Sequence, residues 1–203
     1  MIFEEYIPSW LKKLTNLKIL NQKEGPIPSW LKKLTNLKTL SLSDNNFSGS
    51  IPLWFSELTH LETLNLFKNK LKGLIPKELR SLSNLKRLIL SDNQLTGSIP
   101  EELGYLTKLE ELNLSDNQLI GSIPDELRNL SNLNYLILHN NQLTGSISSS
   151  LGGLTNLILL KLSNNQLTGF IPKNLKKHSK NINPQIKIIR GKEIEHNLLV
   201  NYK

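Results

Sequence analysis

Leucines recur along this chain at fixed intervals, with mostly polar residues between them. In residues 85–90, LKRLIL, one outward position separates Leu88 from Leu90, as in a strand with one buried face. Leu103 and Leu106 follow at the spacing of a short helix that buries one side. The whole arrangement returns every 24 residues. A period of this length predicts a solenoid, in which each coil buries its leucines against its neighbours.

Proline, glycine and asparagine keep the same period of 24. Proline fixes φ before each expected helix, and glycine permits a backbone conformation that a Cβ atom strains. We expect the asparagines to stack as a ladder that satisfies buried backbone groups at the turn after each strand. The prolines are Pro28, Pro52, Pro76, Pro100, Pro124 and Pro172, with Ser148 in the one missing position; the glycines are Gly49, Gly73, Gly97, Gly121, Gly145 and Gly169; the ladder asparagines are Asn45, Asn69, Asn93, Asn117, Asn141 and Asn165.

The unit L-x-x-L-x-L-x-x-N-x-L-x-G-x-I-P-x-x-L-x-x-L-x-x resembles the plant-type leucine-rich repeat, which is marked by L-x-G-x-I-P. The resemblance extends from about Ile7 to Pro172. It implies a right-handed α/β solenoid, with a concave parallel β-sheet on one side and short helical, 3-10 or irregular segments on the convex side. Similar repeats form the ectodomains of plant receptor kinases and polygalacturonase inhibitors. Those proteins usually carry caps that contain cysteine, and this chain has no Cys.

The pattern divides the chain into three parts. Residues 27–172 hold six repeats of 24 residues. Residues 1–26 form a degenerate N-terminal repeat or cap, because the segment 7–18 recurs identically at 27–38 after only 20 residues. We expect this shortened unit to lack most of its strand and the asparagine turn.

The third part, residues 173–203, is a basic C-terminal cap or tail with eight Lys and Arg against Glu193 and Glu195. Its apolar residues favour a cap, in which Ile186–Ile189 adds one edge strand to the sheet and the basic residues keep that edge from aggregating. The alternative is a disordered arm that binds nucleic acid or acidic lipid.

The composition narrows the possible functions. Of 203 residues, 44 are Leu and 24 are Asn, and the absence of Cys excludes disulfides, thiolate metal sites and Cys nucleophiles. The four histidines share no short metal-ligand spacing, so we expect no metal and no cofactor. No apolar run approaches the ~20 residues of a membrane span. The first residues, MIFEE, do not form a signal peptide, which together with the absent Cys favours an intracellular location; an extracellular location stays open if the chain is a fragment.

Each outward position of the expected sheet forms a column with one residue per coil. Most members are polar, but Tyr135, Ile137 and Leu159 place large apolar side chains on two adjacent strands. Such residues ringed by polar groups are typical of protein-binding hot spots. We therefore expect a partner-binding site on the concave face, formed by Phe67, Arg87, Ile89, Glu111, Tyr135, Ile137, His139, Leu159 and Lys161. Alternatively, the C-terminal segment covers this end and makes these residues part of the core.

Charges of opposite sign also alternate along this face. Lys38, Glu62, Lys86 and Glu110 occupy one column, and Arg87 stands beside Glu111 in the next. We expect ion pairs between neighbouring strands, and a face of mixed sign is a poor site for a polyanion.

One constellation has the residue types of a hydrolytic triad. Ser115, His139 and Ser163 stack in one column, with Asp116 close by. Serine is the usual residue of that column, and the sequence contains no motif for an oxyanion hole. We therefore expect His139 to be a contact residue and the protein not to be an enzyme.

These observations predict a non-enzymatic scaffold that binds a protein or peptide through its concave face. One alternative is a secreted or receptor-type recognition module. A further alternative is an ice- or polysaccharide-binding surface, because ladders of Asn, Ser and Thr repeat at ~4.8 Å. Thr96, Thr144 and Thr168 share such a column, but Ser48, Lys72 and Ile120 interrupt it, which argues against ice binding.

Overall fold

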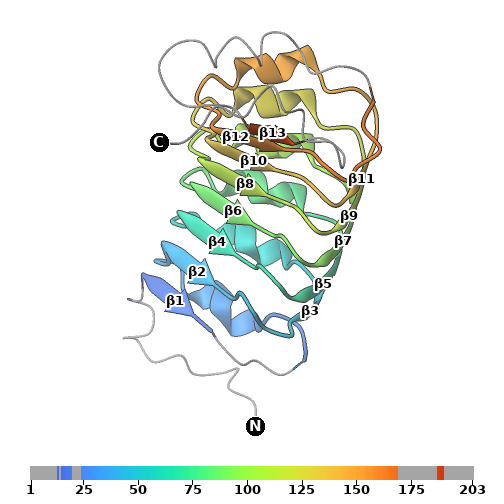
Figure 1. The fold of residues 1–203 in the computed structure, drawn as a ribbon. Coiled ribbons are helices and arrows are strands. Elements are labelled where there is room, and N and C mark those ends of the chain that lie inside the picture. The colour runs from blue at the N-terminus through green and yellow to red at the C-terminus, as the bar shows by residue number, and fades with distance from the viewer. Residues whose placement is uncertain (1–12, 14, 20–23, 169–186, 190–203) are drawn as a thin grey trace, which may run out of the picture.

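The computed structural model describes residues 13, 15–19, 24–168 and 187–189, and it shows a stack of similar coils (Figure 1). One side is an eight-stranded parallel sheet, the concave face, whose strands follow one another from β1 at the bottom of the picture to β12 near the top. The strands are β1 (Asn16–Lys18), β2 (Thr39–Ser41), β4 (Thr63–Asn65), β6 (Arg87–Ile89), β8 (Glu111–Asn113), β10 (Tyr135–Ile137), β12 (Leu159–Lys161) and β13 (Lys187–Ile189).

The pairing register of this sheet follows from the 24-residue period. Leu64 lies opposite Leu88, and Leu88 lies opposite Leu112, so one leucine of every coil stacks on its equivalent in the next. All three side chains are fully buried. Since side chains alternate across a strand, the residues on either side of each leucine face away from the core.

Short 3-10 helices lie behind this sheet and close the core. Each begins after a residue held at φ between −62° and −67°, which is proline in five of the six, and each ends at a leucine whose N–H donates within the turn. The apolar residue in the middle of each helix is buried. The helices are η2 (Ser29–Lys33), η3 (Leu53–Glu57), η4 (Lys77–Ser81), η5 (Glu101–Tyr105), η6 (Asp125–Asn129) and η7 (Ser149–Gly153). No helix among the described residues has the length and apolar character needed to cross a membrane.

A second parallel sheet, which the sequence pattern did not predict, runs along the flank at the right edge of Figure 1. Strands β5, β7 and β9 include the L-x-G segments, and the ladder glycines Gly49, Gly73, Gly97, Gly121 and Gly145 have φ between +76° and +80°. This left-handed backbone explains the glycine ladder. The strands are β3 (Ser48–Ser50), β5 (Lys70–Gly73), β7 (Gln94–Ser98), β9 (Gln118–Gly121) and β11 (Gln142–Leu143).

The ladder asparagines connect adjacent coils at the turn after each strand of the concave face. Asn93 Nδ2 donates to Leu90 O at 3.1 Å in its own coil and to Leu66 O at 2.9 Å in the preceding one. Its Oδ1 accepts the N–H of Leu71 at 3.0 Å. Asn69, Asn117, Asn141 and Asn165 repeat these contacts. One amide per coil thus satisfies backbone groups of two coils.

The N-terminal unit differs from its expected form, because it contributes a complete strand, β1. Leu17 of β1 lies opposite Leu40, and Ile19 O accepts the bond from Asn45 Nδ2 at 2.8 Å. The expectation that this unit lacks most of its strand is therefore wrong. The duplicated sequence aligns residues 20 apart, but the strands pair residues 23 apart. A coil of 23 residues between paired strands is nearly as long as the 24-residue coils that follow. A coil of 20 residues would be four residues too short.

At the opposite end, β13 pairs in parallel with β12, with Leu160 opposite Ile188. This strand coincides with the edge strand expected in the C-terminal segment, of which Ile186 lies outside the described residues. Gly169 and Pro172 of the ladders, and residues 173–186 and 190–203, are also outside them. The choice between a folded cap and a basic arm stays a prediction.

Candidate functional site

The outward positions of β10 and β12 bring together the apolar residues expected on the concave face. Tyr135 lies directly opposite Leu159, and Ile137 lies opposite Lys161. The Tyr135 ring is 39% exposed, and the other three side chains are half-buried. With His139, which follows β10, these residues form one surface that we call the β10–β12 patch: Tyr135, Ile137, His139, Leu159 and Lys161.

The remaining expected site residues lie on the preceding strands. Glu111 is opposite both Tyr135 and Arg87, and so joins the patch to β6, where Ile89 is half-buried. Phe67 follows β4 and is half-buried, and its N–H donates to Asn65 Oδ1 at 3.0 Å. Phe67 thus lies three strands from the β10–β12 patch and is not part of it.

Ion pairs cross the strands at the N-terminal half of this face. Glu62 lies between Lys86, at 2.8 Å, and Lys38, at 3.7 Å. The hydrogen bond and charge of Lys86 hold the pKa of Glu62 below its ordinary value, and Glu62 raises the pKa of Lys86 in return. Arg87 Nε donates to Thr63 Oγ1 at 3.2 Å, and no ion pair joins Arg87 to Glu111, although the structure describes both residues. The expected ion pairs are therefore present for Glu62, whereas neither Glu110 nor Glu111, both of which the structure describes, forms one.

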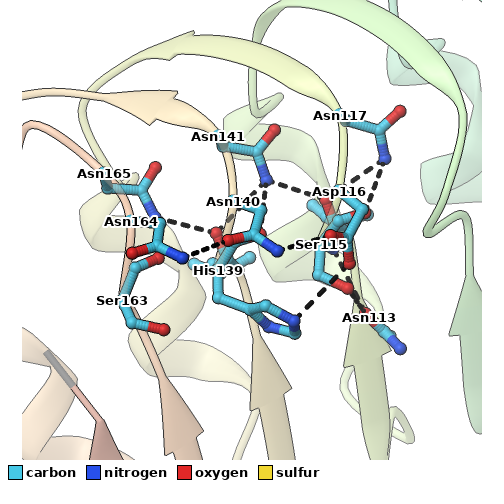
Figure 2. A network of polar contacts seen from close by, with 12 residues as sticks. Asn113, Ser115, Asp116, Asn117, His139, Asn140, Asn141, Ser163, Asn164 and Asn165 are labelled. Carbon is cyan, nitrogen blue, oxygen red and sulfur yellow. Dashed lines mark hydrogen bonds and ion pairs between the residues drawn. The ribbon is translucent and has the colours of Figure 1, made fainter. Parts of the chain in front are cut away.

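A row of polar side chains lies beside the patch, at the turns that follow the strands (Figure 2). Asn164 Nδ2 donates to Asn140 Oδ1 at 2.6 Å, and Asn140 Nδ2 donates to Asp116 Oδ1 at 2.5 Å. All three residues have φ between +54° and +56°, a left-handed conformation that Asn and Asp tolerate better than most residues. The sequence analysis missed this row; its signal was the column of Asp and Asn directly before the ladder asparagine.

His139 connects this row to the β10–β12 patch. Its Nε2 lies 3.5 Å from Asp116 Oδ2, and its side chain is 23% exposed. Burial lowers the pKa of His139, and Lys161 lowers it further, although the charge of Asp116 acts in the opposite direction. The ring is therefore neutral at neutral pH. Its Nδ1 is buried and has no hydrogen-bond partner among the described residues.

The same hydrogen bonds bear on whether Ser115, His139 and Asp116 have the geometry of a catalytic triad. Ser115 Oγ donates to Asn113 Oδ1 at 2.9 Å, so its proton points away from His139 (Figure 2). A nucleophilic serine needs a direct hydrogen bond to its base. His139 uses its exposed edge on Asp116, and its other nitrogen is buried. Within the described part of the chain, no group of three or more His, Cys, Asp or Glu side chains is arranged to hold a metal ion.

Comparison with known proteins identifies the repeats. A family model of two-copy leucine-rich repeats matches residues 27–81 and 83–129, and a single-repeat model matches 132–154 and 156–178. No curated protein sequence matches the chain.

Similar solved structures include receptor ectodomains of Arabidopsis thaliana. The ectodomain of GASSHO1/SCHENGEN3, in complex with CASPARIAN STRIP INTEGRITY FACTOR 2, is 38% identical with a TM-score of 0.78, and the match covers 83% of this chain and 21% of that one. The Arabidopsis HAESA ectodomain, in complex with an N-terminally extended IDA peptide hormone, is 37% identical with a TM-score of 0.80, covering 88% and 29%. The chain thus spans less than a third of either ectodomain.

A third similar structure is a plant ice-binding protein. It is 33% identical with a TM-score of 0.57, and the match covers 80% of this chain and 68% of that one.

Proposed function

This chain belongs to the leucine-rich-repeat family, and from that premise we propose that it is a non-enzymatic scaffold that binds an extended peptide or protein segment through its concave face. The observation that carries the proposal is the β10–β12 patch. Tyr135 is 39% exposed on an open sheet face, although a polar residue satisfies the repeat at that position. A rigid aromatic ring beside aliphatic side chains is the usual centre of a protein-binding surface.

The polar row beside the patch supports the same function. Asp116, Asn140 and Asn164 are held to one another by hydrogen bonds, so they lose little side-chain freedom when a partner binds. Their remaining donors and acceptors can pair with the backbone of an extended segment. The β10–β12 patch then supplies binding energy, and the polar row determines the orientation of the bound segment.

The class of partner is supported by the similar receptor ectodomains, since the HAESA ectodomain is in complex with a peptide hormone and that of GASSHO1/SCHENGEN3 with CASPARIAN STRIP INTEGRITY FACTOR 2. A receptor-type recognition module remains the alternative within the same class. It differs in requiring that the chain be secreted or membrane-anchored.

A pull-down from a source-cell lysate tests the proposal. We compare the wild type with Tyr135→Ala/Leu159→Ala, and expect at least one captured protein to be lost from this variant. The matched control is Tyr105→Ala/Ile120→Ala, which removes one exposed Tyr and one exposed aliphatic residue elsewhere. The control should retain the same protein, and all three chains should have equal melting temperatures. Equal capture by both variants contradicts the proposal.

Binding to ice or an ordered polysaccharide is a second candidate, favoured by the second sheet. Its strands present outward polar residues at ~4.8 Å per strand, but they pair residues 22 apart, so residues 24 apart do not lie opposite one another. Thr96 lies opposite Gln118, and Ile120 lies between Ser98 and Gln142. The similar plant ice-binding protein supports this candidate, although Ile120, which is 49% exposed, interrupts the polar residues.

Growth of ice crystals in the presence of the protein separates the two candidates. If the second sheet binds ice, the wild type slows recrystallisation and Thr96→Lys/Thr144→Lys does not. Tyr135→Ala/Leu159→Ala should then behave like the wild type. Recrystallisation at the rate of buffer alone excludes the ice-binding candidate and leaves the concave-face proposal untouched.

A further inference from the structure

The flank of the solenoid, away from the concave face, contains a groove of about 1530 Å³. It lies where the strands of the second sheet lead into the 3-10 helices, and its lining residues come from five successive coils. Its apolar floor consists of side chains that are at most 4% exposed, and therefore belong to the rigid core: Ile51, Ile75, Ile99, Ile123 and Ile147.

The N-terminal end of the groove is apolar at its surface. Leu53 and Leu74 line it and are 61% and 65% exposed. A Cβ atom added at Gly97 would meet Leu74 Cδ2 at 2.3 Å, so the Leu74 side chain lies against the backbone of the next coil. Two large leucines left this exposed on a rigid support are available to contact another molecule.

The middle of the groove is strongly acidic. Five carboxylates line it against the single ammonium group of Lys77: Glu78, Glu101, Glu102, Asp125 and Glu126. Most of them belong to the first turns of short helices, where a negative charge is favourable, which accounts for the residue type. None of the five groove carboxylates forms an ion pair with a described residue, although the charge of Arg128 acts on Asp125.

Asp125 is held in its charged form. Ser150 Oγ donates to Asp125 Oδ1 at 2.7 Å, and hydrogen bonds from Ser148 and Ser150 hold the pKa of this carboxyl below its ordinary value. Of these two serines, Ser148 lines the C-terminal end of the groove, together with Ser146 and Ser149. The groove therefore changes along its length from exposed leucine to carboxylate to serine.

We propose that this groove docks an extended peptide segment of a partner protein, carrying at least two Lys or Arg residues next to an apolar residue. Five coils at ~4.8 Å span about 19 Å, which accommodates about six residues of extended chain at ~3.3 Å each. Pockets for small molecules are typically about 300–1,000 Å³, so the volume fits a peptide better. The apolar residue lies over Leu53 and Leu74, and the basic residues face the carboxylates, which also repel anionic partners.

Selection from a random 12-residue peptide library tests this docking site. The full chain is the target, and excess Glu101→Gln/Glu102→Gln/Glu126→Gln protein is present as a competitor to remove peptides that bind elsewhere. We expect the surviving peptides to contain two or more basic residues and an apolar one. Measured by fluorescence anisotropy, they should bind the triple variant at least tenfold more weakly than the wild type. Their affinity for the wild type should also fall as salt rises from about 50 to about 300 mM, because salt screens the attraction between the charges.

Two controls keep the result specific. Glu57→Gln/Asp92→Asn/Glu110→Gln removes three carboxylates outside the groove and should bind the peptides within about twofold of the wild type. Tyr135→Ala/Leu159→Ala should also bind them normally, which separates this site from the concave face. Leu53→Lys/Leu74→Lys, which leaves the carboxylates in place, should weaken binding at least tenfold.

The proposal is overturned if no peptide survives the competitor, if the surviving peptides lack basic residues, or if the leucine variant binds as the wild type does. Circular dichroism spectra of all variants should match that of the wild type. If the triple variant fails to fold, the leucine variant replaces it as competitor, and the same three outcomes decide.

Discussion

Single residues stabilise this protein through contacts that recur from coil to coil. Each ladder asparagine from Asn69 onward joins backbone carbonyls of two coils and accepts one backbone N–H, so removing one amide leaves groups unpaired in both coils. Such buried groups cannot turn to water for a substitute partner. His139, like Phe67, departs from a column in which serine is the usual residue, and its pKa is set partly by Asp116 and Lys161 from neighbouring coils.

Replacing Asn117 with alanine tests the ladder. The amide donates to Leu90 O, Leu114 O and Ser115 O and accepts from Leu95 N–H, so Asn117→Ala should lower the free energy of unfolding by ~1–3 kcal/mol. Urea denaturation measures this value. Asn129→Ala, at an exposed position, is the control and should change it little. An unchanged midpoint for Asn117→Ala argues against a structural ladder.

The pH dependence of stability tests the setting of His139. Folding lowers its pKa from the ordinary value of 6.5, so below pH 6.5 the unfolded chain binds more protons and stability falls as the pH decreases. Well above pH 6.5 the ring is neutral in both states and adds no slope. His139→Gln should therefore flatten the decline between pH 6.5 and 5.5, measured by chemical denaturation.

Lys161→Gln is the companion variant, because Lys161 contributes to the lowered pKa of His139. It should reduce the slope without abolishing it. Identical slopes in the wild type and His139→Gln mean that the ring does not titrate differently on folding.

At the scale of elements, each 3-10 helix spans five residues because the coil must then turn back, and all but η7 begin after a proline. The distance between neighbouring 3-10 helices then depends on the side chains between them. Gly104 is buried in η5, and a Cβ atom there meets the backbone oxygen of Glu126 in η6 at 2.4 Å. The close approach of these two helices therefore requires glycine at this position.

Gly104→Ala should destabilise the protein by about 1–3 kcal/mol, because the clash is with backbone that cannot rotate away. Gly153→Ala is a matched control in η7, where the nearest atom, Arg128 O, lies 3.4 Å from the added Cβ. The control should be neutral within ~0.5 kcal/mol or slightly stabilising. Thermal unfolding followed by circular dichroism distinguishes the two, and equal melting temperatures would show that η5 and η6 separate at little cost.

The whole molecule is a stack in which each coil contacts mainly its neighbours. Its two end coils therefore decide whether the sheets have unpaired strand edges. The concave sheet begins at β1 and ends at β13. Without β13, the backbone of β12 becomes an open edge that can pair with another chain. The two large faces are left for binding, and they differ in charge: acids and bases pair across the concave face, whereas acids predominate in the groove.

Deleting residues 173–203 removes β13, and we expect the shortened protein to form dimers or aggregates through β12. Deleting only residues 190–203 retains β13 and serves as the control. Size-exclusion chromatography with light scattering measures the mass of each. If the larger deletion stays monomeric with an unchanged melting temperature, the segment is not a cap and the basic-arm interpretation gains support.

By itself, the sequence determined the coil. The 24-residue period dictated which leucines stack, where the asparagines form their ladder and where each helix begins, because residues 24 apart lie opposite one another in the concave sheet. It also indicated the apolar residues of the β10–β12 patch, since Tyr135 and Leu159 depart from polar columns.

Only the tertiary structure decided what depends on the closed path of each coil. Leu17, not the Leu20 suggested by the duplication, pairs with Leu40, because a full circuit needs nearly 24 residues. The second sheet and its flanking groove exist because left-handed glycines bring successive L-x-G segments side by side. Ser115 bonds to Asn113 and His139 to Asp116, a choice made by side-chain direction, which a linear pattern of residue types does not encode.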